Sequence, residues 1–129
     1  MTMPGMLRVM SVNVVVVDDD PGFRRIATTL LTARGLRVVG ESGDGASALT
    51  AVRELRPDGL LLDLHLPDRD GVEVARMLRE EERPPRIVLT STAKFFWAAE
   101  ELEQAGIASF VAKDKLFDAD LGGLFGATA

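Results

Sequence analysis

Apolar and amphipathic segments alternate along the chain, and this pattern predicts its secondary structure. Five short segments are mostly apolar, and the first is a run of β-branched valines, as in strands buried on both faces of a parallel sheet. The segments between them carry apolar residues at helical spacing, and these residues form the predicted apolar stripes, such as Ile26, Leu30 and Ala33 in the first helix and Val74, Met77 and Leu78 in the third. The expected strands are 12–17, 36–39, 59–63, 86–91 and 107–112, and the expected helices are 21–34, 46–55, 71–83, 94–105 and 118–125. Strands and helices in alternation predict an α/β domain with a parallel sheet.

Capping and breaking residues support several of these boundaries. Asp20 precedes Pro21, which is the arrangement of an N-cap followed by proline in the first turn of a helix. Asp70 and Glu73 have the spacing of a capping box at the start of the third helix, and Pro84 and Pro85 are expected to break that helix. The glycine pair at 122–123 weakens the last helix by about 1 kcal/mol per residue relative to alanine.

Composition narrows the class of protein. The chain has 129 residues, a formal net charge of −5 and no cysteine, so disulfides, zinc–thiolate sites and cysteine nucleophiles are excluded. An acidic chain is a poor nucleic-acid binder by itself. No apolar run approaches the roughly 20 residues that span a bilayer, and no signal peptide is evident, so a cytoplasmic location away from membranes is expected. We expect residues 1–11 to form a flexible leader and residues 12–129 to form one domain.

Chemically active side chains stand where the predicted strands end. Asp18 and Asp19 follow the first strand, Asp63 ends the third, Ser91 ends the fourth, and Lys113 follows the fifth. An aspartate or a lysine after a strand is, taken alone, usually a turn or a solvated residue. Because sites in parallel sheets lie at the carboxyl ends of the strands, however, we expect these side chains to converge.

This set of side chains suits phosphoryl transfer. Clustered carboxylates repel one another and raise each other's pKa unless a cation lies among them. Their oxygens suit Mg²⁺, which neutralises phosphoryl oxygens, and an aspartate is a competent nucleophile. Lys113 would contact the product phosphate as a point charge, and Ser91 would donate a hydrogen bond to it.

The sequence resembles the receiver domains of two-component response regulators. The matching segments are Val-Val-Asp-Asp-Asp-Pro (16–21), Leu-Leu-Asp-Leu-His-Leu-Pro-Asp-Arg-Asp-Gly (61–71), Ile-Val-Leu-Thr-Ser-Thr-Ala (87–93) and Ala-Gly-Ile-Ala-Ser-Phe-Val-Ala-Lys-Asp (105–114). They cover nearly the whole chain, from about residue 11 to residue 116, in the family's order and spacing. The resemblance implies a flavodoxin-like, doubly wound (βα)5 fold with strand order 2-1-3-4-5.

The resemblance also implies a metal-assisted phosphorylation site. Asp63 would be the phosphoacceptor. Asp19 and the Asp63 carboxylate would bind Mg²⁺ directly, the backbone carbonyl of His65 would be a further ligand, and Asp18 would help through a water molecule. The family position of His65 is also linked to the dephosphorylation rate, although a histidine in a loop often contributes nothing beyond its carbonyl.

A conformational switch is implied as well. Ser91 would stand at the family's Ser/Thr switch position, Lys113 at its invariant lysine, and Phe110 at its switch aromatic. Thr90 and Thr92 flank Ser91, so the choice of Ser91 rests on its spacing from Lys113. The family commonly has a small residue where this chain has Thr92, which could narrow access to Asp63.

The implied function is to receive a phosphoryl group from a sensor histidine kinase. The domain would promote only its own phosphorylation and dephosphorylation, and would switch the surface formed by the fourth helix (94–105), the fifth strand (107–112) and the fifth helix (118–125). That surface could also form a homodimer, and the aromatic run 95–97 could contribute to it. The Lys113–Asp114 pair is common in the subfamily with a helix-turn-helix output domain, which would contact DNA in place of this domain.

Two other readings stay open. A degenerate receiver would bind partners without being phosphorylated. An aspartate-nucleophile phosphatase would use a second aspartate two residues after the first, where this chain has His65.

Overall fold

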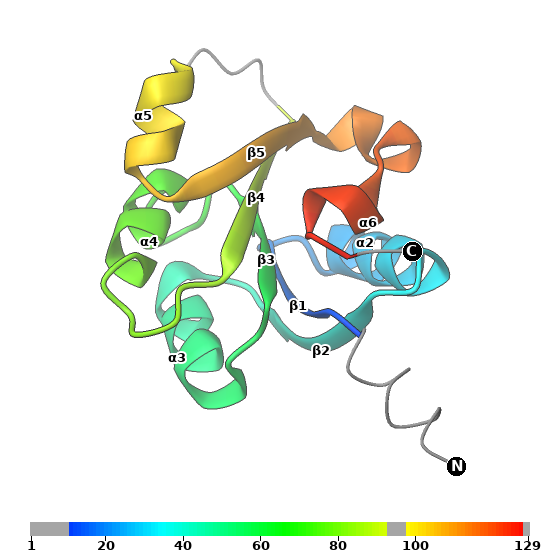
Figure 1. The fold of residues 1–129 in the computed structure, drawn as a ribbon, viewed down its shortest axis with the longest axis horizontal. Coiled ribbons are helices and arrows are strands. Elements are labelled where there is room, and N and C mark those ends of the chain that lie inside the picture. The colour runs from blue at the N-terminus through cyan, green and yellow to red at the C-terminus, as the bar shows by residue number, and fades with distance from the viewer. Residues whose placement is uncertain (1–10, 93–97, 128–129) are drawn as a thin grey trace.

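A single parallel sheet organises the computed structural model, which describes residues 11–92 and 98–127. Its strand order is β2-β1-β3-β4-β5 (Figure 1). The strands are β1 (Asn13–Val17), β2 (Arg37–Ser42), β3 (Gly59–Asp63), β4 (Arg86–Ser91) and β5 (Ile107–Ala112). The flavodoxin-like α/β fold and the order 2-1-3-4-5 are therefore confirmed.

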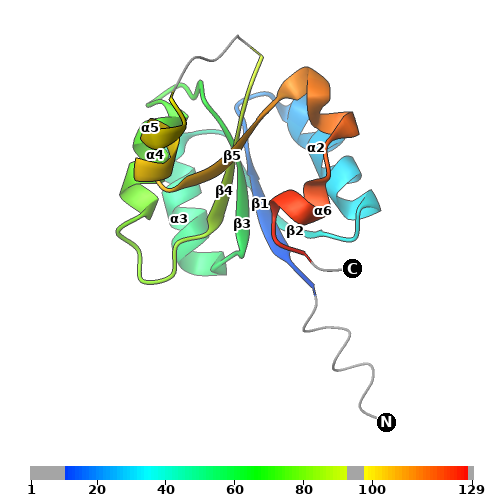
Figure 2. The same cartoon turned by 45° about the horizontal axis from the view of Figure 1, so that its top comes forward.

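Helices cover both faces of the sheet. The described helices are α2 (Pro21–Ala33), α3 (Gly45–Leu55), α4 (Gly71–Leu78), α5 (Ala99–Gln104), the 3₁₀-helix η1 (Lys113–Asp118) and α6 (Leu121–Leu124). With the sheet seen nearly edge-on, α3, α4 and α5 lie on one side and α2 and α6 on the other (Figure 2). This three-layer arrangement gives the chain two apolar cores.

Alternate residues of the central strands feed these two cores. Val15 and Val17 pack in the layer under α3 and α4, whereas Val14 and Val16 pack in the layer under α2 and α6. Every residue of β3 is buried. Strands buried on both faces explain why the sequence shows nearly continuous apolar runs here instead of strict alternation.

Several predicted boundaries agree with the structure. The third, fourth and fifth strands have the predicted bounds. The second strand runs on to Ser42, because its backbone pairs with β1 as far as Val17. Asp20 caps α2 by accepting a hydrogen bond from the Gly22 N–H at 2.9 Å, and Asp70 caps α4 through the Glu73 N–H at 2.8 Å.

The predicted C-terminal helix exists but is shorter than expected. Within the predicted range 118–125 only α6 is α-helical, and η1 follows β5 directly. The side chain of Asp120 accepts a hydrogen bond from the Gly123 N–H at 3.1 Å, which starts a new helix at the glycine pair. Arg34 donates to the carbonyls of Phe117 and Ala119 at 2.6 and 2.7 Å, and so ties this region to the end of α2.

Two residues of the predicted apolar stripes are more exposed than expected, although Val74 and Leu78 of the α4 stripe are buried. Ile26 and Met77 were expected on the apolar stripes of α2 and α4, yet they are 49% and 38% exposed. Ala27 and Leu31 take the buried positions of α2 instead. In α4 the helix ends at Leu78, before the two prolines that were expected to break it.

Some expectations fall on residues outside the described part of the chain. The leader lies there except for its last residue, and so do the start of the predicted helix 94–105 and the aromatic run 95–97. The described portion of that helix is α5. Within residues 11–92 and 98–127, no helix is both long enough and apolar enough to cross a membrane.

A glycine allows α4 to start directly against the end of β3. The Gly71 N–H donates to the Leu64 carbonyl at 2.7 Å. A Cβ at position 71 would lie 2.5 Å from the Asp63 carbonyl oxygen and 3.1 Å from the Leu64 Cα. Both neighbours are backbone atoms, so they cannot move aside cheaply.

We therefore expect Gly71→Ala to lower the free energy of unfolding by about 1–3 kcal/mol or more, because overpacking displaces the backbone at Asp63. Urea unfolding followed by circular dichroism measures this loss. Gly122→Ala is the matched control, since its nearest atoms would lie 3.8 and 4.0 Å away. There alanine should be neutral or stabilising by up to about 1 kcal/mol. Equal losses in the two variants would contradict this account.

Candidate functional site

Three carboxylates meet at the carboxyl edge of the sheet. Asp18 follows β1 and is fully buried, Asp63 ends β3 and is 4% exposed, and Asp19 is exposed. One oxygen from each of the three lies within 4.8 Å of the others. The strands are neighbours with Val17 opposite Leu62, so they end at the same level. The predicted convergence of these aspartates is thus observed.

Lys113 reaches the same cluster from the edge strand β5. Its Nζ lies 2.5 Å from Asp18 Oδ2 and 3.6 Å from Asp63 Oδ2. No described residue donates a hydrogen bond of regular geometry to Asp18 Oδ2, so the ammonium is what compensates this buried oxygen. Among the described residues, the Lys113 ammonium beside three carboxylates leaves a residual negative charge.

Hydrogen bonds between side chains and backbone groups hold the turn after β1. Asp18 Oδ1 accepts a hydrogen bond from the Asp20 N–H at 2.9 Å. Arg24 donates to the Asp18 carbonyl at 2.6 Å and pairs with Glu41 at 2.9 Å. Sequence analysis missed Arg24, although its place on the first turn of the helix that follows the two aspartates was a usable signal.

The surroundings of Asp63 disfavour its charged form. Burial raises the pKa of the Asp63 carboxyl above its usual range, and the neighbouring carboxylates of Asp18 and Asp19 act in the same direction. The Lys113 ammonium and a hydrogen bond from the His65 backbone lower the pKa, but they do not cancel the rise. Asp63 is therefore a carboxylate whose negative charge is only partly compensated by the protein.

His65 contributes to the site through its backbone, which donates a hydrogen bond to the Asp63 carboxylate. Its side chain is exposed, and its backbone forms an isolated antiparallel bridge with Asp70. The loop is held a second time by Asp68, whose carboxylate accepts hydrogen bonds from the Gly45 and Ala46 N–H groups at 2.8 and 3.0 Å. These bonds lower the pKa of Asp68. Sequence analysis did not single out Asp68, because nothing local to it indicates contact with α3.

Ser91 and Phe110 lie on the other face of the sheet from Asp63. Leu89 pairs in register with Phe110, and both pack in the core layer under α3 and α4. Ser91 is fully buried and comes two residues after Leu89, so it shares that face. Asp63 comes two residues after Leu61, which packs in the opposite layer.

The two threonines beside Ser91 are in different surroundings. Thr90 is buried in register with Asp63, and its hydroxyl donates to the Leu62 carbonyl at 3.5 Å. Thr92 is exposed. Of the three hydroxyls, only that of Ser91 belongs to a buried residue on the same face as Phe110.

The acidic cluster fits a hard divalent cation. The described ligand atoms are carboxylate oxygens, which Mg²⁺ prefers, and one of them is a buried oxygen without a regular hydrogen bond. The excess of negative charge points the same way. Asp18, Asp19 and Asp63 are the residues that could hold such an ion.

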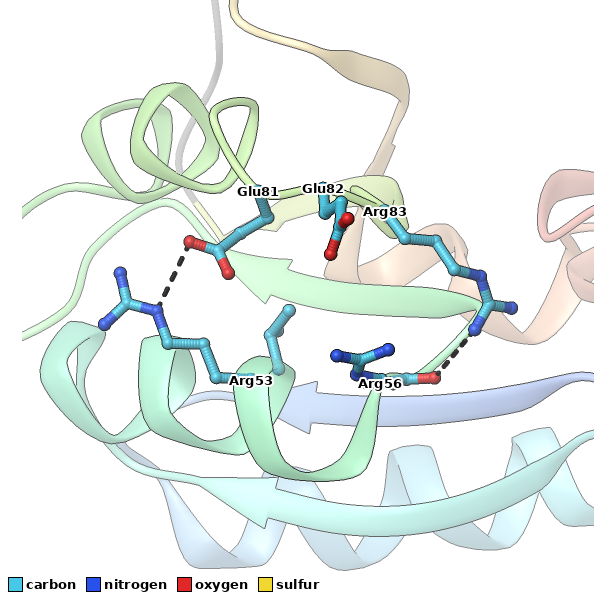
Figure 3. Close-up of a pocket in the computed structure, with 6 residues that line it drawn as sticks. Arg53, Arg56, Glu81, Glu82 and Arg83 are labelled. Carbon is cyan, nitrogen blue, oxygen red and sulfur yellow. Dashed lines mark hydrogen bonds and ion pairs between the residues drawn. The ribbon is translucent and has the colours of Figure 1, made fainter.

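A hollow lies at the other end of the sheet from the acidic cluster, between the end of α3 and the turn after α4 (Figure 3). Its charged groups are mostly satisfied within the protein. Arg53 pairs with Glu81 at 3.3 Å, and Arg83 pairs with Asp58 at 2.6 Å and donates to the Arg56 carbonyl at 3.5 Å. Asp58 precedes β3, so this hollow is roughly one strand length, about 16 Å, from Asp63.

Comparisons with known proteins match this arrangement. The response regulator receiver domain family matches residues 14–120. The chain is 40% identical over 104 residues to the NarL protein of Mycobacterium tuberculosis, covering 80% of this chain and 48% of that protein. It is 47% identical over 78 residues to the DNA-binding response regulator MtrA of Mycolicibacterium smegmatis, covering 60% of this chain and 34% of that protein. The chain thus spans about a half and about a third of these relatives.

A solved structure shows the same likeness. The signal receiver domain of NarL from Mycobacterium tuberculosis superposes with a TM-score of 0.74 at 36% identity, covering 90% of this chain and 98% of that one. Fold, acidic edge and sequence therefore agree, and the chain belongs to the family of response regulator receiver domains.

Proposed function

We propose that this domain receives a phosphoryl group on Asp63 from a sensor histidine kinase, in a reaction that depends on Mg²⁺. The observation that carries the proposal is the meeting of a buried, incompletely compensated Asp63 with two further carboxylates and the Lys113 ammonium, 3.6 Å from Asp63 Oδ2. Such a group of charges is unfavourable without a function that uses it.

In this step one oxygen–phosphorus bond forms and one phosphorus–nitrogen bond breaks. An Asp63 carboxylate oxygen attacks the phosphorus atom, and the phosphorus–nitrogen bond of a phosphohistidine breaks. The imidazole leaves with the bonding electron pair and takes up a proton. Lys113 pairs with the phosphoryl oxygens as a point charge, and Ser91 donates a hydrogen bond to them.

The proposed metal ligands are Asp19, Asp63 and the backbone carbonyl of His65, with Asp18 acting through water. These residues would hold a Mg²⁺ ion, which would supply charge neutralisation for the phosphoryl oxygens. The backbone ties of the surrounding loops, through Asp20, Arg24 and Asp68, keep these oxygens in place.

Ser91 and Phe110 form the proposed switch. When Ser91 turns toward the phosphoryl group it vacates space on its face of the sheet, and Phe110 can turn inward. Because the two share one core layer, this is a choice between two packings whose populations shift on phosphorylation. The readout surface comprises α5, β5 and the C-terminal segment, and a homodimer through that surface is part of the proposal.

The output belongs to the whole protein and is likewise proposed. The relative MtrA is described as DNA-binding, and the chain spans 34% of it. We infer that this domain controls transcription through a separate DNA-binding domain and has no enzymatic activity beyond its own phosphorylation and dephosphorylation.

The direct test is incubation with acetyl phosphate and Mg²⁺, followed by intact mass and by mapping of the modified residue. We expect a gain of one phosphoryl group on Asp63, which EDTA abolishes. Asp63→Asn should lose the label completely, whereas Asp114→Asn, an exposed carboxylate next to Lys113, should keep it. An unlabelled wild type would favour the degenerate receiver, which binds partners only.

The raised pKa of Asp63 predicts a pH-dependent stability. Its contribution is present below the ordinary pKa of about 3.9 and is lost as pH rises through the raised value, because the folded state then holds a disfavoured charge. In EDTA, Asp63→Asn should therefore unfold at higher urea than wild type at pH 7. Each pH unit between the two pKa values is worth about 1.4 kcal/mol. The difference should shrink toward pH 4; a constant difference, as expected for Asp114→Asn, would contradict this assignment.

The Lys113–Asp18 ion pair predicts competition with the metal. Lys113→Ala removes a positive charge from the cluster, so Mg²⁺ should bind at least as tightly as in wild type, by up to about tenfold, or about 1.4 kcal/mol. Phosphorylation should nevertheless slow, because the phosphoryl group loses a partner. Calorimetric titration measures the affinity, and Lys115→Ala, an exposed lysine two residues on, is the control. Weaker Mg²⁺ binding in Lys113→Ala would disprove the competition.

A further inference from the structure

An aromatic ring lies against the lysine of the acidic cluster. The Nζ of Lys113 is 4.3 Å from the centroid of the Phe23 ring. A cation over a ring face within about 6 Å is attracted by the quadrupole of the ring. We propose that Phe23 is a positioning residue that holds the Lys113 ammonium at the carboxyl edge of the sheet.

Lys113 needs such a partner because of where it starts. It follows β5, and two strands, β4 and β3, lie between β5 and β1 in the sheet. A lysine stem has four flexible bonds, so the ammonium could take many positions in solvent. The contacts with Asp18 at 2.5 Å, with Asp63 at 3.6 Å and with the Phe23 ring confine it to one.

The ring is held by the same turn that holds Asp18. Phe23 is the third residue of α2 and packs, half-buried, against the core layer under that helix. Asp20 caps the helix, and Arg24, next to Phe23, donates a hydrogen bond to the Asp18 carbonyl at 2.6 Å. The Phe23 ring and the Asp18 carboxylate therefore contact the Lys113 ammonium from one continuous segment, the turn after β1 and the start of α2.

A ring suits this role better than a fourth carboxylate. It attracts the ammonium without neutralising it, so the positive charge stays available for phosphoryl oxygens. It also adds no formal negative charge to a site that is already overcharged. This inference rests on the proposed phosphorylation of Asp63 for its functional consequence, but the contact itself is independent of it.

The contact is tested first without metal or phosphoryl donor. The chain has three lysines, at 94, 113 and 115, so protein labelled with ¹³C-lysine gives few signals, and Lys113→Arg assigns the one of interest. The ring current of Phe23 should shift the ε-methylene protons of Lys113 upfield of those of Lys115. Phe23→Leu should remove this shift and Phe23→Tyr should keep it. An unchanged shift in Phe23→Leu would overturn the proposal.

The functional consequence is tested by a double-mutant cycle on the rate of acetyl phosphate labelling at saturating Mg²⁺. Phe23→Leu should slow labelling roughly 2- to 10-fold, and Phe23→Tyr should restore most of the rate. In the Lys113→Ala background, Phe23→Leu should have no further effect. Independent, multiplicative losses would assign Phe23 a merely structural role and refute the proposal.

The two ideas fail in different ways. If wild type is not labelled at all, the proposed function fails, and the lysine spectra still decide the Phe23 contact. If wild type is labelled and the cycle shows no coupling, only the positioning role of Phe23 fails. Urea unfolding of each variant confirms that rates are compared between folded proteins.

Discussion

Repulsion among three carboxylates is the constraint around which this end of the molecule is built. One oxygen each of Asp18, Asp19 and Asp63 lie within 4.8 Å of one another, and in the described part of the chain the Lys113 ammonium pairs with this cluster. Such a cluster is unfavourable, and it persists because β1 and β3 are anchored in the two apolar cores. The stability of the central strands is thus what keeps the charges together, and the incomplete compensation leaves the cluster able to attract a cation.

The alternation of side chains along the strands separates the acidic site from its proposed switch. Asp63 follows Leu61 onto the face covered by α2, whereas Ser91 follows Leu89 onto the face covered by α3 and α4. Both residues end their strands at the carboxyl edge of the sheet. In the proposed switch, a change at Asp63 would therefore be passed to the opposite layer at this edge.

Most of the fold and the central residues of the site could be predicted from the sequence. Buried parallel strands produce apolar runs with sharp ends, so the bounds of β3, β4 and β5 could be located, and the strand-end rule then selected Asp18, Asp63 and Lys113. This inference needs only periodicity and order along the chain, both of which are local properties.

The remaining features depend on contacts between distant segments. Phe23 touches Lys113 across 90 positions, and Asp68 caps a helix that begins 23 residues earlier. The last helix starts later than predicted because Asp120 caps it and Arg34 binds the Ala119 carbonyl just before it. Ile26 was wrongly predicted to be buried, because an apolar stripe shifted by one residue along α2 still has helical spacing.

In the loop after β3, the backbone of residue 65 is held by the protein while its side chain is exposed. At position 65 the peptide group is tied into the protein through the bridge to Asp70, while the imidazole points into solvent. Under the proposed function, a metal ligand supplied by the main chain of residue 65 would survive any substitution that leaves the path of the chain unchanged. The side chain at this position could then vary in chemistry while the backbone that supports the charged cluster is kept.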